Sequence, residues 1–398
     1  MSIRSLIIVS HGYPCNKDGT WFPFVQQFAH AVARQGVRVS VIAPLPFHLA
    51  IQGRDSWHST EAISAGAHVD VYRPKCLSLS CKQFLCWNTE QLGLRSFYRA
   101  TKRVLRTTPA VISDVIYGHF LYRGGQAAVR LGKELHLPAF PMVGEHQLVS
   151  VQSFGFERAR RHFSTATGFM ANSKCLGRLL QQHLGIAHER IGIFPNGIDH
   201  RKFYSRDRNA MRKKLGLPQE GFIVICVAKQ DLQKGPSRVG EAIQKLEGVS
   251  GVFLGSGIHP PQADNIIQNG SVPHDQVPEW LSAADVFVLP STYEGSCNAI
   301  LEAMACGLPV VSSTGDFNDD ILNDNVSIRV DPLDVSAIRE AIVRLRDDPG
   351  LRQKMSRAAL AWAPHFDIDR RARRILDYME SMRQPAHTST HGGSARSS

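Results

Sequence analysis

The chain has 398 residues, of which 43% are hydrophobic and 20% are charged, a composition typical of folded globular proteins. This length exceeds what one ordinary hydrophobic core organises, so we predict two domains. The longest apolar runs, such as residues 222–228, are far shorter than the roughly 20 residues that span a bilayer. The N-terminal apolar stretch is too short for a secretory signal, and the eight cysteines form no C-x-x-C pair. We therefore expect a cytoplasmic protein with reduced thiols.

Positive charge is concentrated in the first half of the chain. Residues 1–200 hold 22 Lys and Arg against 11 Asp and Glu, whereas residues 201–398 hold 24 against 24. Much of the excess lies in residues 94–109, where apolar residues alternate with Arg95, Arg99, Lys102, Arg103 and Arg106. Such a helix either rests on an anionic membrane surface, receives an anionic ligand, or is an ordinary solvated face. No recognition motif for nucleic acid accompanies the charge, so we do not expect that partner.

Short β-branched runs alternate with amphipathic helical windows in both halves, the pattern of parallel sheets covered by helices. In the first half we expect a helix over residues 21–36 and strands over residues 5–10, 38–44, 111–120, 139–143 and 166–173. In the second half we expect a helix over residues 298–306 and strands over residues 221–228, 249–255, 285–291 and 308–313. The fold class predicted from this order is α/β, with two doubly wound domains.

The change from strand-like to charged sequence after residue 193 marks the boundary between the domains. We predict an N-terminal domain over residues 1–198, a C-terminal domain over 199–367, a last helix over 368–384 and a disordered tail over 385–398. Asp367 directly precedes the last helix, where a carboxylate is a favourable N-cap.

Two carboxylates flank a segment that otherwise has the pattern of a small apolar helix. The turn Y-E-G-S-C follows a predicted strand and leads into N-A-I-L-E-A-M-A-C, residues 298–306. Ligands of doubly wound sheets bind beyond the carboxyl ends of the strands, and free N–H groups at a helix start bind phosphate or sugar oxygens. Glu294 lies in the turn and Glu302 within two turns of the helix, about 10 Å further on. One long ligand would meet both carboxylates.

Other polar residues also follow predicted strands. Lys229 and Lys234 lie in a glycine-bearing loop, where two cations neutralise a diphosphate without a metal. In the first half, Gly19 precedes the first helix and His119 follows a strand. A lone histidine is usually structural, but three such loops in one domain make His119 a candidate. Cys297 is either a reactive thiol with a pKa lowered by the helix N-terminus and the lysines, or a small residue that merely fits.

Three motifs carry a family resemblance. Residues 294–311, E-G-S-C-N-A-I-L-E-A-M-A-C-G-L-P-V-V, contain two Glu separated by seven residues, followed by G-x-P-V-V. Residues 227–235 are similar to V-G-R-x4-K-G, and residues 194–203 to P-N-G-[IV]-D-x3-F. In this combination and order they resemble glycosyltransferase family 4, retaining enzymes of the GT-B fold. The ordered matches cover nearly the whole chain.

The resemblance implies the GT-B fold: two Rossmann-like domains facing across a cleft, with the last helix crossing back to an acceptor-binding N-terminal domain. By similarity, Glu294 would contact the donor sugar near the reacting carbon, with His119 facing it, and Glu302 would bind the ribose hydroxyls. Lys229 and Lys234 would hold the diphosphate. Backbone N–H groups would help from Gly19, Gly295, Ser296, Cys297 and Asn298.

Some positions depart from the family pattern. Lys229 replaces the usual Arg, so a point charge stands where a forked contact is expected, and Asp18 with Gly19 replaces a glycine pair. Residues 367–369, D-I-D, are similar to the metal-binding D-x-D of the other glycosyltransferase fold, but the N-cap interpretation of Asp367 is preferred. We therefore expect no metal and no cofactor, with a UDP- or GDP-sugar as co-substrate.

The leading interpretation is a retaining glycosyltransferase. It would move a sugar to a glycan or lipid-linked glycan acceptor in cell-surface polysaccharide synthesis, in the cytoplasm or peripherally at the inner membrane face. Two alternatives remain: a nucleotide-sugar epimerase of the same fold, and a non-catalytic scaffold subunit of a glycan-assembly complex.

Overall fold

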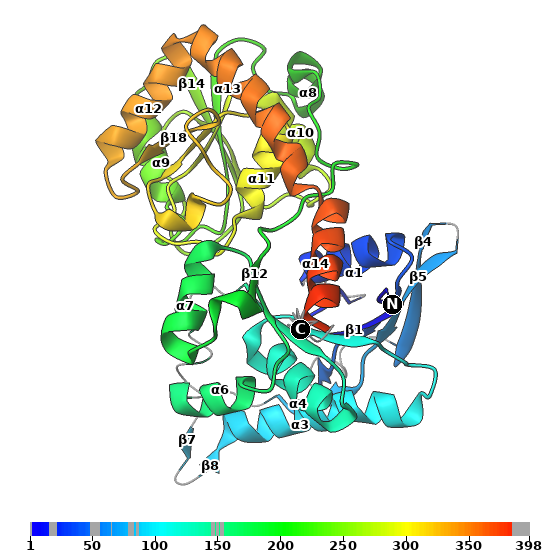
Figure 1. Ribbon diagram of the computed structural model, residues 1–398. Helices are drawn as coiled ribbons and strands as arrows, with labels where there is room; N and C mark the ends of the chain where they lie inside the picture. Colours follow the sequence, from blue (N-terminus) through cyan, green and yellow to red (C-terminus); the bar gives the residue numbers. More distant parts are fainter. Residues whose placement is uncertain are drawn as a thin grey trace, which may run out of the picture.

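The computed structural model describes residues 2–15, 22–47, 56–64, 66–78, 83–84, 87–144, 148, 151 and 155–383. Two parallel-rich sheets, each covered by helices, form the two predicted α/β domains, which lie one above the other in Figure 1. Gly19 and the predicted tail over residues 385–398 lie outside the described residues. Within the described part, no helix is both long and apolar enough to cross a membrane.

The N-terminal sheet has eight strands in the order β12-β11-β10-β9-β1-β2-β5-β4. All its neighbouring strands pair in parallel except β4 and β5, an antiparallel edge pair. The strands are β1 (Ser5–Val9), β2 (Arg38–Ile42), β4 (His58–Ser64), β5 (Ala67–Tyr72), β9 (Val115–Gly118), β10 (Ala139–Val143), β11 (Phe169–Ala171) and β12 (Ile191–Ile193). The central strands match the predicted ones. The edge strand β4 was not predicted, because it has no buried residue and hence no apolar run.

Helices and short elements complete the N-terminal domain. The α-helices are α1 (Pro23–Arg34), α3 (Thr89–Thr107), α4 (Gln126–Leu135), α6 (Phe156–Phe163) and α7 (Lys174–Leu184). The short elements are β3 (Leu45–Pro46), β6 (Lys75–Cys76), β7 (Gln83–Phe84), β8 (Trp87–Asn88), η1 (Leu121–Gly125) and η2 (His188–Arg190). Gly36, with a φ of +82°, follows α1 in the left-handed region that favours glycine, as the predicted end of this helix requires.

The C-terminal sheet is entirely parallel, in the order β15-β14-β13-β16-β17-β18. Its strands are β13 (Phe222–Val227), β14 (Val249–Leu254), β15 (Ile266–Gly270), β16 (Val286–Leu289), β17 (Val310–Ser313) and β18 (Ser327–Val330). The helices are α8 (Arg208–Leu215), α9 (Pro236–Ile243), α10 (Val277–Ala283), α11 (Asn298–Ala305), η3 (Asp316–Asn318), α12 (Val335–Asp347), α13 (Pro349–Trp362) and η4 (Ala363–Phe366). In α11, the apolar side chains of Ile300, Leu301 and Met304 are buried in the core, so the helix that carries Glu302 is firmly packed.

Helix α14 (Ile368–Arg383) follows the last helices of the C-terminal domain but packs on the N-terminal domain, alongside α1 (Figure 1). Asp367 caps it as predicted, because its carboxylate accepts the backbone N–H groups of Asp369 and Arg370 at 2.9 and 3.0 Å. The helix therefore packs into the core of the N-terminal domain, although it follows the C-terminal domain in the sequence. It contributes four buried residues to that core: Ile368, Ala372, Ile375 and Met379.

The chain crosses between the domains twice, and the two crossings are hydrogen-bonded to each other. Ile198 donates its N–H to the carbonyl of Phe366 at 2.8 Å and accepts the N–H of Ile368 at 3.0 Å. A Cβ on Gly197 would lie 2.8 Å from the Cα of Ile368, so only glycine fits where the crossings approach. The relative position of the domains is therefore set at this pair of crossings.

Replacing Ile375 with alanine is expected to destabilise the N-terminal domain by about 2 to 5 kcal/mol, since a fully buried aliphatic side chain leaves a cavity. Urea unfolding measures this. Asp377→Ala on the exposed face of the same helix is the matched control, expected to change stability by less than about 0.5 kcal/mol. Equal effects of the two variants would show that α14 is not part of this core.

Candidate active site between the domains

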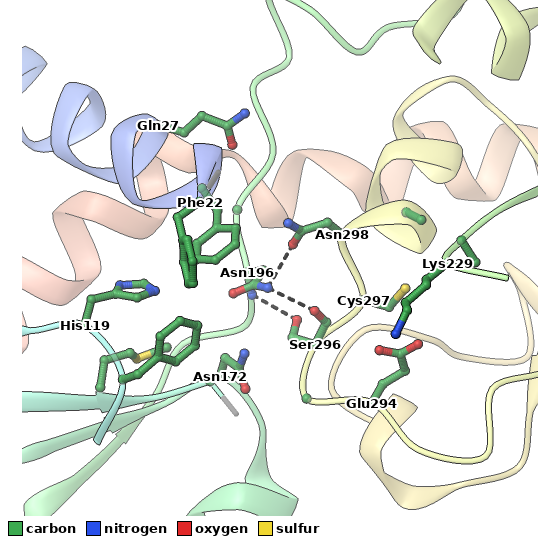
Figure 2. A pocket seen from close by; sticks show the side chains of 18 of the residues that line it. Phe22, Gln27, His119, Asn172, Asn196, Lys229, Glu294, Ser296, Cys297 and Asn298 are labelled. Atoms are coloured by element: carbon green, nitrogen blue, oxygen red, sulfur yellow. Dashed lines mark hydrogen bonds between the residues drawn. The ribbon is translucent and has the colours of Figure 1, made fainter. Parts of the chain in front are cut away.

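A cavity of about 1040 Å³ lies between the two domains. Its walls come from the residues that follow strands β1, β9, β10 and β11 in the N-terminal domain, and β13 and β16 in the C-terminal domain. These are the carboxyl ends of both sheets, where ligands of doubly wound folds bind. Figure 2 shows His119 and Asn172 on one side of the cavity, and Lys229 and Glu294 on the other.

Most of the predicted site residues line this one cavity, although they are spread over the sequence. They are His119, Lys229, Lys234, Glu294, Gly295, Ser296, Cys297 and Asn298. Glu302 does not line it; this carboxylate borders a small adjacent pocket that shares Gln27 and Asn298 with the main cavity. The described residues contain no group of three or more His, Cys, Asp or Glu side chains arranged to hold a metal ion.

Glu294 and Lys234 form the strongest ionic contact of the cavity. The ammonium of Lys234 donates to both carboxylate oxygens of Glu294, at 2.6 and 2.7 Å. Burial lowers the pKa of Lys234, but the charge of Glu294 and its hydrogen bond with Lys234 oppose this effect, and the pKa lies above its ordinary value. Lys234 therefore stays charged in a largely buried place. Lys229, by contrast, is exposed and lies 3.4 Å from Asp231.

The loop of residues 295–298 closes the cavity beneath the start of α11. Gly295 approaches the other domain so closely that a Cβ would lie 3.0 Å from the carbonyl oxygen of Gly144. Cys297 occupies the N-cap position of α11, and its side chain caps no backbone N–H group. The first N–H groups of a helix can bind an anion where no side chain caps them.

His119 faces the cavity from the N-terminal domain as a neutral imidazole. Burial lowers its pKa well below the ordinary value, and the charge of Arg371 lowers it further. The hydroxyl of Tyr117 lies 2.8 Å from Nδ1 of His119. Among the residues that the structure describes, none hydrogen-bonds Nε2, which is the ring nitrogen left for a ligand.

Comparison with known proteins identifies the family. Residues 24–202 match the family described as Glycosyltransferase Family 4, and residues 207–362 match Glycosyl transferases group 1. The two matches meet at the interdomain crossing and together take in both walls of the cavity. The chain belongs to glycosyltransferase family 4.

Relatives and solved structures agree with this membership. The glycosyltransferase is 25% identical to the putative teichuronic acid biosynthesis glycosyltransferase TuaC of Bacillus subtilis, over 85% of this chain and 88% of that protein. Sucrose-phosphate synthase from Thermosynechococcus elongatus has a similar fold, with a TM-score of 0.75 and 19% identity over 95% of this chain and 99% of that one. Anabaena HepE, solved with UDP-glucose, gives a TM-score of 0.66 and 17% identity over 95% and 100%. The predicted GT-B fold is confirmed.

Asn196 is a site residue of the glycosyltransferase that the sequence analysis did not single out. Its backbone N–H donates to Oγ of Ser296 at 3.0 Å, and its side-chain amide donates to the carbonyl of Ser296 at 2.9 Å and to Asn298 at 2.8 Å (Figure 2). The interdomain crossing is thus fastened to the loop at the start of α11. The signal was present in the P-N-G motif, which was used above only as part of the family resemblance.

Arg371 and an aromatic wall were also missed. Arg371 reaches the cavity from α14, and its Nε donates to the carbonyl of Pro195 at 2.8 Å. On the N-terminal side, ring centroids lie 5.0 Å apart for His11 and Phe22, and 4.5 Å apart for His119 and Phe120. No local motif marks these residues, because they come together only when α1, α14 and two strand ends pack.

Cys297 does not have the lowered pKa that the reactive-thiol hypothesis requires. Burial raises its pKa to about 12, with a further upward contribution from the charge of Glu294. Lys234 and the N–H groups of α11 act in the opposite direction but are outweighed. The hypothesis failed because it counted the helix N-terminus and the lysines but not the desolvation of a buried thiolate. The alternative, a small residue that fits the packed N-cap, agrees with the structure.

Cys297 is expected to resist iodoacetamide at pH 8 in the native protein, since only the thiolate reacts and the raised pKa leaves almost none. Mass spectrometry of the labelled peptides should give a rate at least roughly 100-fold below that in urea, because each pKa unit lowers the thiolate fraction about tenfold. Half-buried Cys15 is the internal reference. Equal native and unfolded rates for Cys297 would contradict the burial argument.

Glu302 is paired with His274 at the edge of the donor side. Nε2 of His274 lies 3.3 Å from the carboxylate, and this hydrogen bond raises the pKa of His274 against the opposing effect of burial. The pair therefore stabilises the folded protein fully below the ordinary pKa of histidine. Its contribution is lost as the pH rises through the raised pKa.

Replacing Glu302 with glutamine is expected to lower the pKa of His274 toward the ordinary value for histidine, because the carboxylate that stabilises the imidazolium is removed. NMR titration of 13C-labelled histidine measures it. Glu340→Gln makes the same charge change on the exposed face of α12 and is expected to leave the pKa of His274 unaltered. An unchanged titration in Glu302→Gln would show that the two groups do not interact.

Proposed function

We propose that this glycosyltransferase moves a sugar from a UDP- or GDP-sugar to a glycan or lipid-linked glycan acceptor, with retention at the anomeric carbon. The observation that carries the proposal is the contact between Lys234 and Glu294 at the start of α11, in a cavity built by both domains. The name of its teichuronic acid relative supports a role in cell-surface polysaccharide synthesis. We place this work in the cytoplasm or at the inner membrane face.

The C-terminal wall of the cavity suits the diphosphate of the donor. Lys229 and Lys234 supply two positive charges, and residues 295–298 present backbone N–H groups at the start of α11. Cations and a helix N-terminus stabilise the negative charge that grows on a departing nucleoside diphosphate. In this proposal the chain itself supplies that positive charge, so transfer needs no metal and no cofactor. That HepE was solved with UDP-glucose supports a nucleotide-sugar as ligand.

Glu294 would contact the donor sugar near the reacting carbon. Lys234 fixes the position of this carboxylate with two hydrogen bonds, and a positioned group acts best on a transition state because no reorganisation is needed. Glu302 would bind the ribose hydroxyls after exchanging its contact with His274 for the ligand. The two glutamates would then hold different ends of one donor.

The N-terminal wall suits the acceptor and the face of the donor sugar. Neutral His119 offers Nε2 as a hydrogen-bonding group, and the aromatic rings beside it provide apolar faces of the kind on which sugars stack. Retention would follow from front-side attack, with the acceptor hydroxyl entering on the side from which the diphosphate leaves. The departing phosphate would take the acceptor proton, so no separate base is required.

Hydrolysis of a panel of UDP-, GDP- and ADP-sugars in EDTA tests the proposal. We expect release of nucleoside diphosphate from one donor, with the sugar keeping its configuration at the other carbons. A product epimerised in the sugar ring would indicate an epimerase, and no turnover of any donor would indicate a scaffold. Activity that returns only with added Mg²⁺ or Mn²⁺ would contradict metal-independent transfer.

The same assay separates the two glutamates. Glu294→Gln is expected to lower kcat roughly 100-fold or more while nucleotide affinity changes little, because the group acts on the reacting sugar. Glu302→Gln is expected to weaken nucleotide binding about tenfold, the value of one hydrogen bond to a charged group. Calorimetry with UDP and GDP gives the affinities, and Glu340→Gln is the control. The reverse pattern would refute the two roles.

A further inference from the structure

A second pocket, of about 280 Å³, lies in the N-terminal domain outside the cleft. Four arginines line it, each from a different element: α3, η1, α4 and α6. They are Arg95, Arg123, Arg130 and Arg158. His162 of α6 and the side chains of Gln91, Tyr98 and Gln126 complete its polar lining. Residues far apart in the sequence thus bring positive charge to one small hollow.

Glu134 contacts one of the four arginines of this pocket, Arg130. Glu134 lies 3.4 Å from Nε of Arg130, but it also accepts a hydrogen bond from Lys102 at 2.5 Å. Among the described residues, none of the carboxylates comes within 4.0 Å of Arg95 or Arg123. Nε of Arg123 is buried with no hydrogen-bond partner in the described part of the chain, and its two terminal nitrogens reach only Ser78, at 3.4 Å.

The backbone holds Arg123 in place at a conformational cost. Its φ of +52° lies in the left-handed region, which side chains other than glycine rarely adopt. Such conformations persist where the surrounding structure enforces them, and they are enriched at binding sites. The half-buried Arg123 and the three other arginines, which are exposed, thus bring four guanidinium groups to one hollow.

His162 is affected by the same positive charges. Burial lowers its pKa, the carbonyl of Gln126 at 3.0 Å acts in the opposite direction, and Arg130 and Arg158 lower the pKa further. An anion placed among the arginines would offset their effect, so His162 is a local reporter of binding.

We propose that this pocket binds a phosphate group. Guanidinium groups match phosphate oxygens with paired hydrogen bonds, and four of them around a small hollow favour a compact, multiply charged anion over a neutral sugar. The pocket is too small for a whole nucleotide-sugar, whose place is the cleft.

The pocket adjoins the cleft through η1. Tyr122 lines the cleft cavity, whereas the next residue, Arg123, lines the pocket. The charge of Arg123 also helps to lower the pKa of His11 to about 4, after the larger effect of burial, and His11 lines the cleft. A phosphorylated acceptor held here would therefore lie beside the reacting cavity. That identity of the ligand rests on the proposed function; phosphate binding itself does not.

Titration with inorganic phosphate at constant ionic strength, followed by NMR of 13C-labelled histidine, tests the site. The pKa of His162 is expected to rise by roughly one unit at saturation, because an anion offsets the neighbouring arginines. Replacement of His162 with glutamine assigns the signal. The readout requires no sugar transfer, so it holds even for a protein inactive with every donor.

Arg95→Gln and Arg99→Gln form a matched pair, since both remove one exposed charge from α3 but only Arg95 lines the pocket. Arg95→Gln is expected to raise the half-saturating phosphate concentration about tenfold, and Arg99→Gln less than about twofold. The double variant Arg95→Gln with Arg158→Gln should lose the response. Equal effects of the matched pair would overturn the proposal, because the response would then reflect general surface charge.

Vesicles distinguish a free phosphorylated ligand from a lipid headgroup. Response to inorganic phosphate with the expected difference between the matched variants supports a soluble phosphate ligand. A headgroup phosphate is supported if the protein does not respond to free phosphate and sediments with phosphatidylglycerol vesicles but not with phosphatidylcholine vesicles. Arg95→Gln should then weaken sedimentation more than Arg99→Gln does. Failure of both phosphate and phosphatidylglycerol would overturn the proposal.

Discussion

The buried carboxylate of Glu294 is the constraint on which the donor side of the molecule depends. An unpaired buried charge costs several kcal/mol, so this carboxylate needs a cation nearby. Lys234, from the loop after β13, meets the requirement at 2.6 Å, which ties that loop to the one after β16. The same contact leaves both groups on the wall of the cleft. The ion pair of Lys234 and Glu294 therefore both stabilises the two loops and places these two polar groups at the cleft.

The second constraint is the connection between the domains. Asn196 links the first crossing to the loop at the start of α11, and Arg371 links α14 to the carbonyl of Pro195. Gly197 lets the crossings approach, and Gly295 lets the loop approach the N-terminal domain. These contacts link the loop before α11 to the interdomain crossing and to the N-terminal domain. A cleft enzyme needs such a coupling if closure is to complete its site.

The structure shows where basic residues of the first half of the chain lie. The basic residues expected on one helix face divide between different surroundings: Lys102 contacts Glu134, Arg103 lies over the ring of Trp57, and Arg95 lines the four-arginine pocket. The expectation of a membrane-facing helix stays a prediction. The structure adds a defined place on this domain where positive charge converges from four elements.

The order of strands and helices, the family and most of the cleft residues could be predicted from the sequence alone. This was possible because the motifs around Glu294, Lys234 and Asp367 are local, and each places a side chain at a strand end or a helix start whatever the rest of the chain does. Boundaries of exposed elements such as β4 were not predictable, since they lack a buried run.

Properties that depend on neighbours distant in sequence could be established only from the packed fold. Burial reversed the expected direction of the Cys297 pKa, and burial together with the charge of Arg371 lowers the pKa of His119. Glu302 proved to contact His274 outside the main cavity. The four-arginine pocket, too, exists only when separate helices pack together. Desolvation and long-range charge are sums over packed neighbours, and a linear pattern does not contain them.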